Sequence, residues 1–315
     1  MELTRRAFGA AAAGSLAGLM ASDSAEAAPA PSTAMFADAC DCHVHIIGPM
    51  DKYPMTANRA YTPPPATVAQ LLALRKRLGI ARNILVQPSF YGTDNSCMLD
   101  AMAEIGPTAR GIAVVAPNIS DADLKAMDAK GVRGIRINLE TAGVRDPKAA
   151  SALLKTMGGK IKPLGWHIQI YTVLPVVAQM IGPIADCPVP VVLDHFAGVT
   201  AADGTAQKGF IGLLDLVRAR KAYVKLSAPY RVSKKPGYAD VTPIAQSLIY
   251  AARDHMLWAT DWPHTATIPG KKNTEVTPFY KIDDNASLRQ FNSWYPDETT
   301  RKMILVDNPA KLYRF

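Results

Sequence analysis

Short apolar runs rich in β-branched residues alternate with amphipathic segments along most of this chain. Eight such runs occur, at residues 39–46, 83–87, 111–116, 132–139, 166–171, 189–195, 223–227 and 256–261. Strands that alternate with helices in this way form parallel βα units. Eight of these units in about 280 residues predict an α/β fold of a single domain, the TIM (β/α)8 barrel.

The segments between the runs show helical periodicity. Residues 67–78, 120–130 and 242–253 are expected helices, and Ser120 with Asp123 three positions later resembles an N-terminal capping arrangement. A doubly wound open sheet is the alternative fold. That fold carries a glycine-rich phosphate turn after its first strand, and the sequence HIIGPM at this place is not such a turn.

Composition narrows the functional classes. The chain has 315 residues, of which 49% are apolar and 20% are charged, and this excludes a disordered chain, a disulfide-rich miniprotein and a collagen-like fibre. The formal charge of +8 comes from 35 Lys and Arg against 27 Asp and Glu. These basic residues are scattered and not interleaved with aromatics, so we expect no nucleic-acid partner and instead a small anionic ligand.

Residues 1–27 resemble an export signal. A twin arginine, Arg5 and Arg6, is followed by Phe8, a short Ala/Gly/Leu-rich stretch and a small-x-small tripeptide at residues 25–27. This pattern is typical of a cleaved twin-arginine signal. We therefore expect a mature barrel of residues 28–315 that is periplasmic or exported through the twin-arginine machinery; the alternative is an uncleaved, disordered N-terminus in a cytoplasmic protein. The apolar stretch is too short for a membrane span.

The four cysteines would be able to form disulfides in an oxidising compartment. Cys40 and Cys42 are separated by one extended residue, so they cannot easily pair with each other. Cys97 and Cys187 lie far apart in the sequence. We expect mostly buried free thiols.

Polar residues that follow the expected strands carry the candidate chemistry, because the active sites of TIM barrels lie at the carboxyl ends of their strands. The first run ends in His43 and His45. Strand alternation predicts that Asp41 shares their face and that Cys42 and Val44 point the other way. Two imidazoles in this place either hold a divalent ion or polarise a carbonyl oxygen without a metal.

Two further strand ends complete a set with these histidines. His195 ends the sixth run and Asp261 ends the eighth. Asp261 is the expected general base, able to take a proton from water with or without a metal. His264 is expected to order the loop that follows, whereas His167 and His255 lie at the starts of strands and are expected to be structural.

Eight motifs in the mature chain resemble one family. In order they are DCHVHIIGP, NRAYTPPPA, LVQPSFYGTDN, GVRGIRIN, WHIQIY, LDHFAG, YVKLSAPYRVS and WATDWPH. Together they resemble the amidohydrolase superfamily, in its branch of 2-pyrone-4,6-dicarboxylate lactonase and related lactone hydrolases. The resemblance implies a hydrolase that opens the ester of an anionic lactone of the pyrone-dicarboxylate, muconolactone or sugar-acid type. It implies that His43, His45 and His195 polarise the carbonyl, and that Asp261 activates water.

The same resemblance implies a substrate-binding set, composed of Tyr61, Ser89, Arg136, Tyr171 and Arg231. The residues themselves support two of these assignments. Arg136 lies late in a strand, where a guanidinium needs an anionic partner. Arg231 lies in a loop close to further lysines, and these cations together would attract an acid.

The chain departs from the family pattern at two positions. Ala142 stands where the resemblance implies a second arginine, although Arg145 is close enough in sequence to replace it, and Ala266 stands near an expected asparagine. A related lactone with one acid group, a sulfonate or a sugar acid is therefore as well supported as the dicarboxylate.

Metal dependence is open at this stage. Binuclear relatives carry a carboxylated lysine and a histidine where this chain has Arg136 and Tyr171, so the resemblance argues against two metals. The chain either holds one divalent ion, zinc or manganese, on His43, His45 and Asp261, with or without His195, or works without a metal.

Two other functions stay open beside lactone hydrolysis. Relatives on the same barrel decarboxylate aromatic or unsaturated acids with a firmly bound metal, and they release carbon dioxide where lactone opening releases a proton. A barrel that only binds its ligand is the second alternative, because TIM barrels host many functions. A homo-oligomer is also left open.

Overall fold

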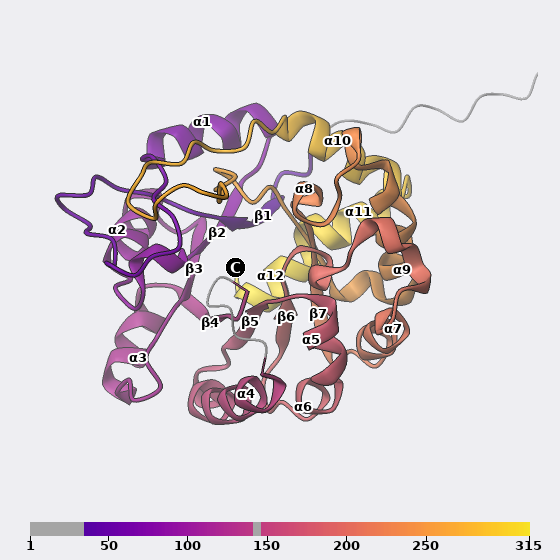
Figure 1. Ribbon diagram of the computed structural model, residues 1–315, viewed down its shortest axis with the longest axis horizontal. Coiled ribbons are helices and arrows are strands. Elements are labelled where there is room, and N and C mark those ends of the chain that lie inside the picture. The colour runs from indigo at the N-terminus through magenta and orange to yellow at the C-terminus, as the bar shows by residue number, and fades with distance from the viewer. Residues whose placement is uncertain (1–34, 141–145) are drawn as a thin grey trace, which may run out of the picture. The chain divides into compact units, whose positions relative to one another are not determined.

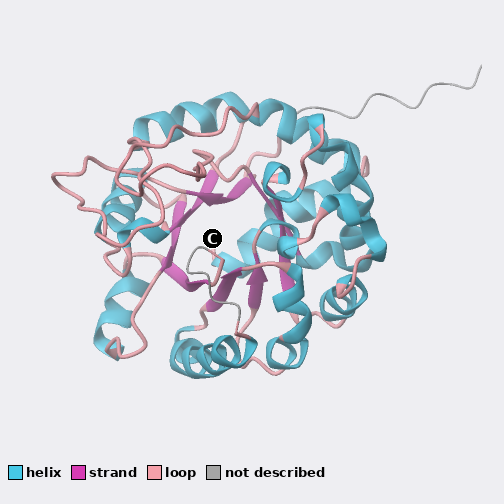
Figure 2. Ribbon diagram, viewed as in Figure 1, coloured by secondary structure: helices cyan, strands magenta, loops and turns pink. Residues whose placement is uncertain are grey.

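The computed structural model describes residues 35–140 and 146–315, and these form a (β/α)8 barrel. Eight parallel strands lie in one sheet in sequence order, so the predicted TIM barrel is confirmed (Figure 1). Figure 2 shows the strands as an inner ring with the helices outside it. The strands are β1 (Cys40–Val44), β2 (Arg82–Val86), β3 (Ala109–Ala113), β4 (Val132–Asn138), β5 (His167–Tyr171), β6 (Val191–Leu193), β7 (Ala222–Ser227) and β8 (Met256–Ala259).

The helices cover the outside of the ring, and the three expected from periodicity are α1, α3 and α9. Helix α3 begins at the predicted cap, where the Ser120 hydroxyl accepts from the backbone N–H of Asp123, and α1 begins at Thr67, which forms a capping box. The α-helices are α1 (Val68–Leu78), α2 (Ser96–Ile105), α3 (Asp121–Ala129), α4 (Pro147–Ile161), α5 (Leu174–Gln179), α6 (Ile181–Ala185), α7 (Phe210–Arg218), α8 (Pro229–Val232), α9 (Thr242–Ala252), α10 (Asp284–Trp294), α11 (Glu298–Lys302) and α12 (Asn308–Tyr313). Among residues 35–140 and 146–315, none of the helices has the length and apolarity that crossing a bilayer requires.

Strands β1 and β8 meet where the ring closes. The Asp41 carboxylate accepts hydrogen bonds from the backbone N–H of Thr260 at 3.0 Å and from its hydroxyl at 2.5 Å. The backbone N–H of Asp261 donates to the carbonyl of His43 at 3.1 Å. Burial raises the pKa of Asp41 to about 7, although the hydrogen bonds from Thr260 oppose the rise. This contact brings two of the predicted catalytic residues together.

The alternation predicted for β1 is wrong. The pairing of β1 with β2 changes register between Asp41 and Val44, which marks an irregularity in the strand. Cys42 belongs to the apolar cluster inside the barrel, whereas Val44 belongs to the larger cluster between strands and helices. Both His43 and His45 still reach the interior, but Cys42 lies inside as well. Sequence alternation could not show this, because an irregular register depends on the neighbouring strand.

The floor of the barrel is closed by the C-terminal segment, whose end lies within the ring in Figure 1. Tyr313 is fully buried there and packs edge to face on His167, with the ring centroids 5.3 Å apart. Burial lowers the pKa of His167 to about 3. His255 stacks on Tyr223 just before β8. Both histidines therefore serve packing, as the sequence predicted.

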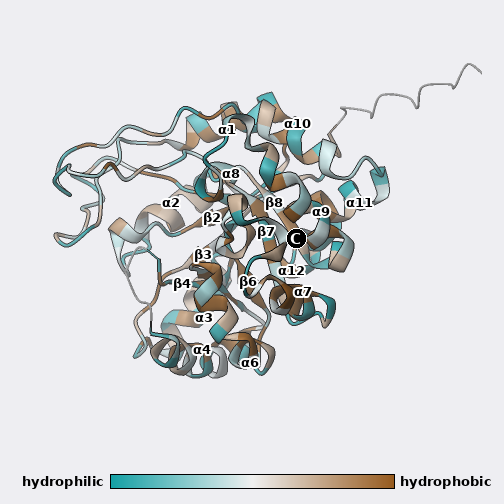
Figure 3. Cartoon of the chain, turned by 45° about the vertical axis from the view of Figure 1, so that its right-hand side comes forward, coloured by the Kyte–Doolittle hydropathy of each residue, from teal (hydrophilic) through white to brown (hydrophobic). Residues whose placement is uncertain are grey.

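The core follows the binary pattern of the sequence. In Figure 3 the strands are mostly brown, for hydrophobic residues, and many outer helix turns and loops are teal. Within the described residues all four cysteines are free thiols; Cys40, Cys42 and Cys97 are buried, and Cys187 is partly exposed. The predicted free thiols are therefore found.

Replacement of Gly198 should disturb the turn after β6. Its φ is +67°, and a Cβ added there would clash with the Thr172 carbonyl oxygen. We expect Gly198→Ala to lower the free energy of unfolding by about 2 kcal/mol or more, through backbone strain and the clash. Gly204→Ala is the matched control, because Gly204 has a φ of +63° and no atom within 4 Å of that position. Equal losses in urea unfolding of the two variants would contradict the clash.

Candidate active site

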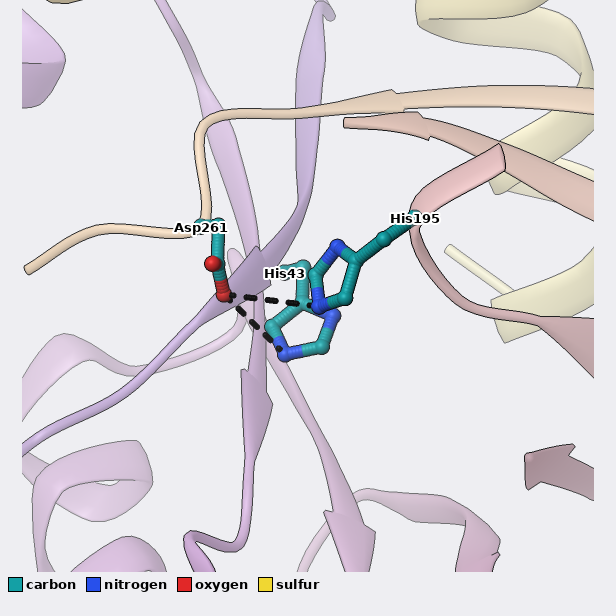
Figure 4. A group of neighbouring side chains, drawn as sticks. All are labelled: His43, His195 and Asp261. Atoms are coloured by element: carbon teal, nitrogen blue, oxygen red, sulfur yellow. Dashed lines mark ion pairs between the residues drawn. The ribbon is translucent and has the colours of Figure 1, made fainter. Parts of the chain in front are cut away.

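Four buried side chains converge at the carboxyl ends of the strands. His43 and His45 come from β1 and the residue just beyond it, His195 follows β6 and Asp261 follows β8. Asp261 Oδ1 lies 3.6 Å from His43 Nε2, 3.8 Å from His45 Nε2 and 3.8 Å from His195 Nε2. Figure 4 shows the Asp261 carboxylate facing the rings of His43 and His195. The structure thus brings the four predicted catalytic residues together.

Unusual backbone conformations direct two of these side chains. His195 and Asp261 have φ values of 49° and 68°, in the left-handed region that residues other than glycine seldom adopt. Such a conformation costs on the order of 1–3 kcal/mol and persists only where the surrounding structure holds it. Other residues of the chain also have positive φ values, but these two carry an imidazole and a carboxylate at strand ends, where backbone strain points to a functional site.

The second oxygen of Asp261 is held by two neighbours from α8. Arg231 Nε and the Tyr230 hydroxyl each lie 2.6 Å from Asp261 Oδ2. Burial by itself would raise the pKa of Asp261, but the Arg231 guanidinium outweighs it and keeps that pKa well below its usual range. Asp261 is therefore an ionised carboxylate at neutral pH, with Oδ1 turned toward the histidines.

The histidines are uncharged at neutral pH. Burial lowers the pKa values of His45 and His195 to about 4, and it lowers that of His43 well below the usual range. His45 Nδ1 lies 2.7 Å from the Val86 carbonyl oxygen, which can only accept, so this nitrogen carries the proton. His45 Nε2 is therefore an acceptor. It can bind a water hydrogen or a cation, but it cannot donate to a carbonyl.

A layer of buried polar residues that sequence reasoning missed lies beneath His43. Lys225 of β7 is fully buried, and its Nζ lies 2.6 Å from Gln169 Oε1. The same Nζ lies 3.3 Å from His43 Nδ1 and 3.3 Å from Asp194 Oδ1. The sequence contained a signal for this layer, because Gln169 and Lys225 are polar residues with apolar neighbours on both sides in their strands.

A cavity of about 320 Å³ opens above the catalytic residues, and it is large enough for a small ring compound. All five predicted substrate-binding residues line it, together with Asn138, Glu140, Thr265 and Thr267, which the sequence did not single out. Ala266 is buried, whereas its neighbour Thr265 accepts from the Tyr61 hydroxyl at 3.2 Å. Ala142 and Arg145 lie outside the described residues.

Arg136 gives this cavity an unused hydrogen-bond donor. Its Nη1 donates to the Gln87 carbonyl oxygen at 3.3 Å, its Nη2 lies 3.8 Å from Asp194 Oδ2, and its guanidinium lies 5.6 Å from the centre of the Tyr171 ring. Within the described part of the chain its Nε is buried and has no hydrogen-bond partner. A buried guanidinium with free donor capacity suits a carboxylate or sulfonate of the ligand.

The donor set also suits a divalent cation. In residues 35–140 and 146–315, Asp261 Oδ1 is buried and accepts no hydrogen bond. Ligand atoms about 2.0–2.1 Å from a tetrahedral zinc lie roughly 3.3 Å apart, close to the spacings found here. One donor atom each from His43, His195 and Asp261 lie within 4.8 Å of one another. His195 therefore joins the set predicted from sequence, and His45 Nε2 lies 3.3 Å from His43 Nε2 beside it.

The sequence profile of the amidohydrolase family matches residues 40–315. The chain belongs to this family. This amidohydrolase is 34% identical to 2-pyrone-4,6-dicarboxylate hydrolase from Comamonas testosteroni, over 90% of this chain and 92% of the relative. It is 33% identical to 4-sulfomuconolactone hydrolase from Rhizobium radiobacter, over 87% of this chain and 89% of the relative. The resemblance seen in the motifs is confirmed.

A solved structure supports the same assignment. The crystal structure of a Pseudomonas putida protein, named as a candidate 2-pyrone-4,6-dicarboxylic acid hydrolase, matches this amidohydrolase with a TM-score of 0.76 at 26% identity. The match covers 89% of this chain and 98% of that one. The barrel and the order of its elements are therefore shared over nearly the whole domain.

Proposed function

We propose that this amidohydrolase opens the ester bond of a small anionic lactone. The observation that carries the proposal is the composition of one cavity, which is lined by the ionised Asp261 carboxylate, the imidazoles of His45 and His195, and two arginines, with His43 buried next to Asp261. The named activities of its relatives, on 2-pyrone-4,6-dicarboxylate and 4-sulfomuconolactone, support the substrate class. Both names describe lactones that carry acid groups.

The catalytic step begins with water. Asp261 Oδ1, the free oxygen of the ionised carboxylate, takes a proton from a water molecule, and His45 Nε2 is an acceptor placed to hold the second hydrogen. The hydroxide attacks the lactone carbonyl carbon, and the ring ester bond breaks as the carbonyl re-forms. The ring oxygen leaves as an alkoxide or enolate and receives the proton that Asp261 took from water, which restores the ionised base. The new carboxylic acid loses its proton at neutral pH, so the net reaction releases one proton.

The arginines orient the substrate. Arg136 and Arg231 lie on the wall of the cavity with Tyr61, Ser89 and Tyr171, and their cations suit the acid groups of the ligand. Arg231 has a second role, because its Nε also holds Asp261 Oδ2 at 2.6 Å. Two arginines on one cavity wall favour an anionic lactone over a neutral one.

We propose a mononuclear metal site as an addition compatible with this cavity. His43, His195 and Asp261 would hold one divalent ion such as zinc or manganese, with His45 beside them. A bound ion of this kind acts as a Lewis acid and lowers the pKa of water. The buried Asp261 Oδ1 supports the assignment, because no hydrogen bond within the described residues satisfies it.

We also propose export of the protein. The support is the sequence alone: Arg5, Arg6 and Phe8 followed by a small-residue cleavage pattern, all outside the described residues. Expression of the full chain with and without Arg5→Lys and Arg6→Lys, followed by fractionation, tests it. Cleavage and export that persist in the double variant would contradict twin-arginine export.

Proton release tests the lactonase proposal. Purified protein is assayed with a panel that contains 2-pyrone-4,6-dicarboxylate, muconolactones and sugar-acid lactones, with and without added zinc or manganese, and the opened acid is identified by mass. We expect rapid proton release with at least one anionic lactone and none with its neutral methyl ester. Carbon dioxide release, or no reaction in any condition, would overturn the proposal.

The pH profile should reflect the histidines and not Asp261. Because the pKa of Asp261 lies well below its usual range and those of His45 and His195 are about 4, we expect kcat/KM to stay level down to about pH 5 and to fall near pH 4. An acidic limb near pH 6.5 would contradict buried neutral imidazoles.

The same lowered pKa values destabilise the fold progressively below about pH 6.5, because unfolded histidine binds the proton that the folded site excludes. Circular dichroism at each pH separates unfolding from catalysis.

A further inference from the structure

The strongest unexplained feature of the interior is the fully buried Lys225 against a histidine of the site. An ammonium group carries three hydrogens, and Lys225 Nζ makes contacts of hydrogen-bond geometry with Gln169 Oε1 at 2.6 Å and His43 Nδ1 at 3.3 Å. It also forms an ion pair with Asp194 Oδ1 at 3.3 Å. The contact between Lys225 Nζ and His43 Nδ1 has the geometry of a hydrogen bond. Lys225 can only donate, so His43 Nδ1 is the acceptor.

Asp194 is the other possible hydrogen-bond partner of His43 Nδ1, and its geometry is less favourable. Asp194 Oδ1 lies 3.3 Å from His43 Nδ1, yet this oxygen accepts no hydrogen bond of proper geometry within the described residues. The other oxygen of Asp194 accepts from Gln169 Nε2 at 3.0 Å. The carboxylate is therefore oriented by Gln169, and the contact from Lys225 satisfies His43 Nδ1.

We propose that Lys225 is a positioning residue that keeps the proton of neutral His43 on Nε2. The Nε2–H then faces two acceptors, His45 Nε2 at 3.3 Å and Asp261 Oδ1 at 3.6 Å. With the proton on Nδ1 instead, three acceptor atoms would face one another with no hydrogen between them.

Two consequences follow for the site. His43 becomes an imidazole that can donate from Nε2 toward Asp261 Oδ1 and so help to hold the general base, a role that His45 cannot fill because its Nε2 is an acceptor. Metal binding becomes less favourable, because His43 can offer a lone pair on Nε2 only after its proton moves to Nδ1, where Lys225 opposes it. The catalytic consequence rests on the proposed lactonase function, whereas the consequence for metal affinity does not.

Zinc affinity of Lys225→Met tests the proposal without substrate. We expect the variant to bind zinc about tenfold or more tightly than the wild type in competition with a fluorescent chelator, because Nδ1–H is then free to donate to Asp194. The control is Lys221→Met at an exposed lysine just before β7, and the zinc affinity of this variant should equal that of the wild type. A purely structural role for Lys225 predicts weaker binding, so an unchanged or lower zinc affinity overturns the proposal.

The wild-type protein supplies a second test that does not depend on folding of the variant. Nitrogen-15 spectra of labelled histidine report which ring nitrogen carries the proton, and His43→Gln identifies the signal of this residue. We expect a protonated Nε2 and an unprotonated Nδ1 for His43 in metal-free protein at neutral pH. A protonated Nδ1 overturns the proposal, whatever the lactone assay shows.

Discussion

Asp261→Asn should abolish turnover while leaving the fold and substrate binding largely intact. The amide is nearly the same size, and its oxygen can still accept from Tyr230 and Arg231, which lie 2.6 Å from Oδ2. An amide cannot take a proton from water, and general-base catalysis contributes about 10²–10⁴-fold. We expect kcat to fall by about 10³-fold or more with little change in the Kd for substrate.

The measurement is proton release at saturating lactone, with substrate affinity from calorimetry. Asp215→Asn is the matched control, because Asp215 is an exposed residue of α7 and is not one of the residues that line the cavity. Its kcat should equal that of the wild type. If Asp261→Asn keeps more than about a tenth of the wild-type kcat, another group removes the proton from water.

Arg231→Met should produce the second largest loss, through two separate effects. The substitution removes a cation from the cavity wall, which weakens binding of an acid substrate and raises KM. It also leaves the buried Asp261 carboxylate without its strongest stabilising charge, and so the pKa of Asp261 rises. We expect kcat/KM at pH 7 to fall by about 10²–10³-fold, in line with the loss of one anchoring charge and part of the base.

The pH profile separates this explanation from simple loss of binding. In the variant, kcat should increase with pH over a range in which the wild type is level, because deprotonated Asp261 is recovered only as the pH rises above its new pKa. Arg231→Lys keeps a charge but not the fork that holds both Asp261 and the Thr265 carbonyl, so its loss should be intermediate. Arg289→Met, at an exposed position on α10, should have no effect. A level pH profile in Arg231→Met would limit Arg231 to substrate binding.

Local rules predicted the framework of the site well. The eight apolar runs correspond to eight strands, and the residues at their carboxyl ends line one mouth, because a barrel places all these ends on the same side. Polar residues that directly follow a strand can therefore be assigned to the active site from the sequence alone, before any contact between them is known. The export signal stays a prediction, since residues 1–34 lie outside the described part of the chain.

Other features depended on neighbours that sequence order does not reveal. The irregular register in β1 puts Cys42 inside the barrel and overrides simple alternation. Lys225 lies 182 residues from His43 along the chain, although their nitrogens are 3.3 Å apart. A lysine inside an apolar strand signals a buried charge, but its partners become known only once the strands have closed into a ring.

The sequence by itself therefore determined the barrel, the family and the types of residue at its mouth, because periodicity, strand ends and motifs are local properties of the chain. Only the tertiary structure decided the chemistry of individual atoms: which Asp261 oxygen is free, which nitrogen of His45 is an acceptor, and which group contacts His43 Nδ1. These depend on burial and on the directions of hydrogen bonds between distant strands. Such contacts exist only after folding has brought those strands together.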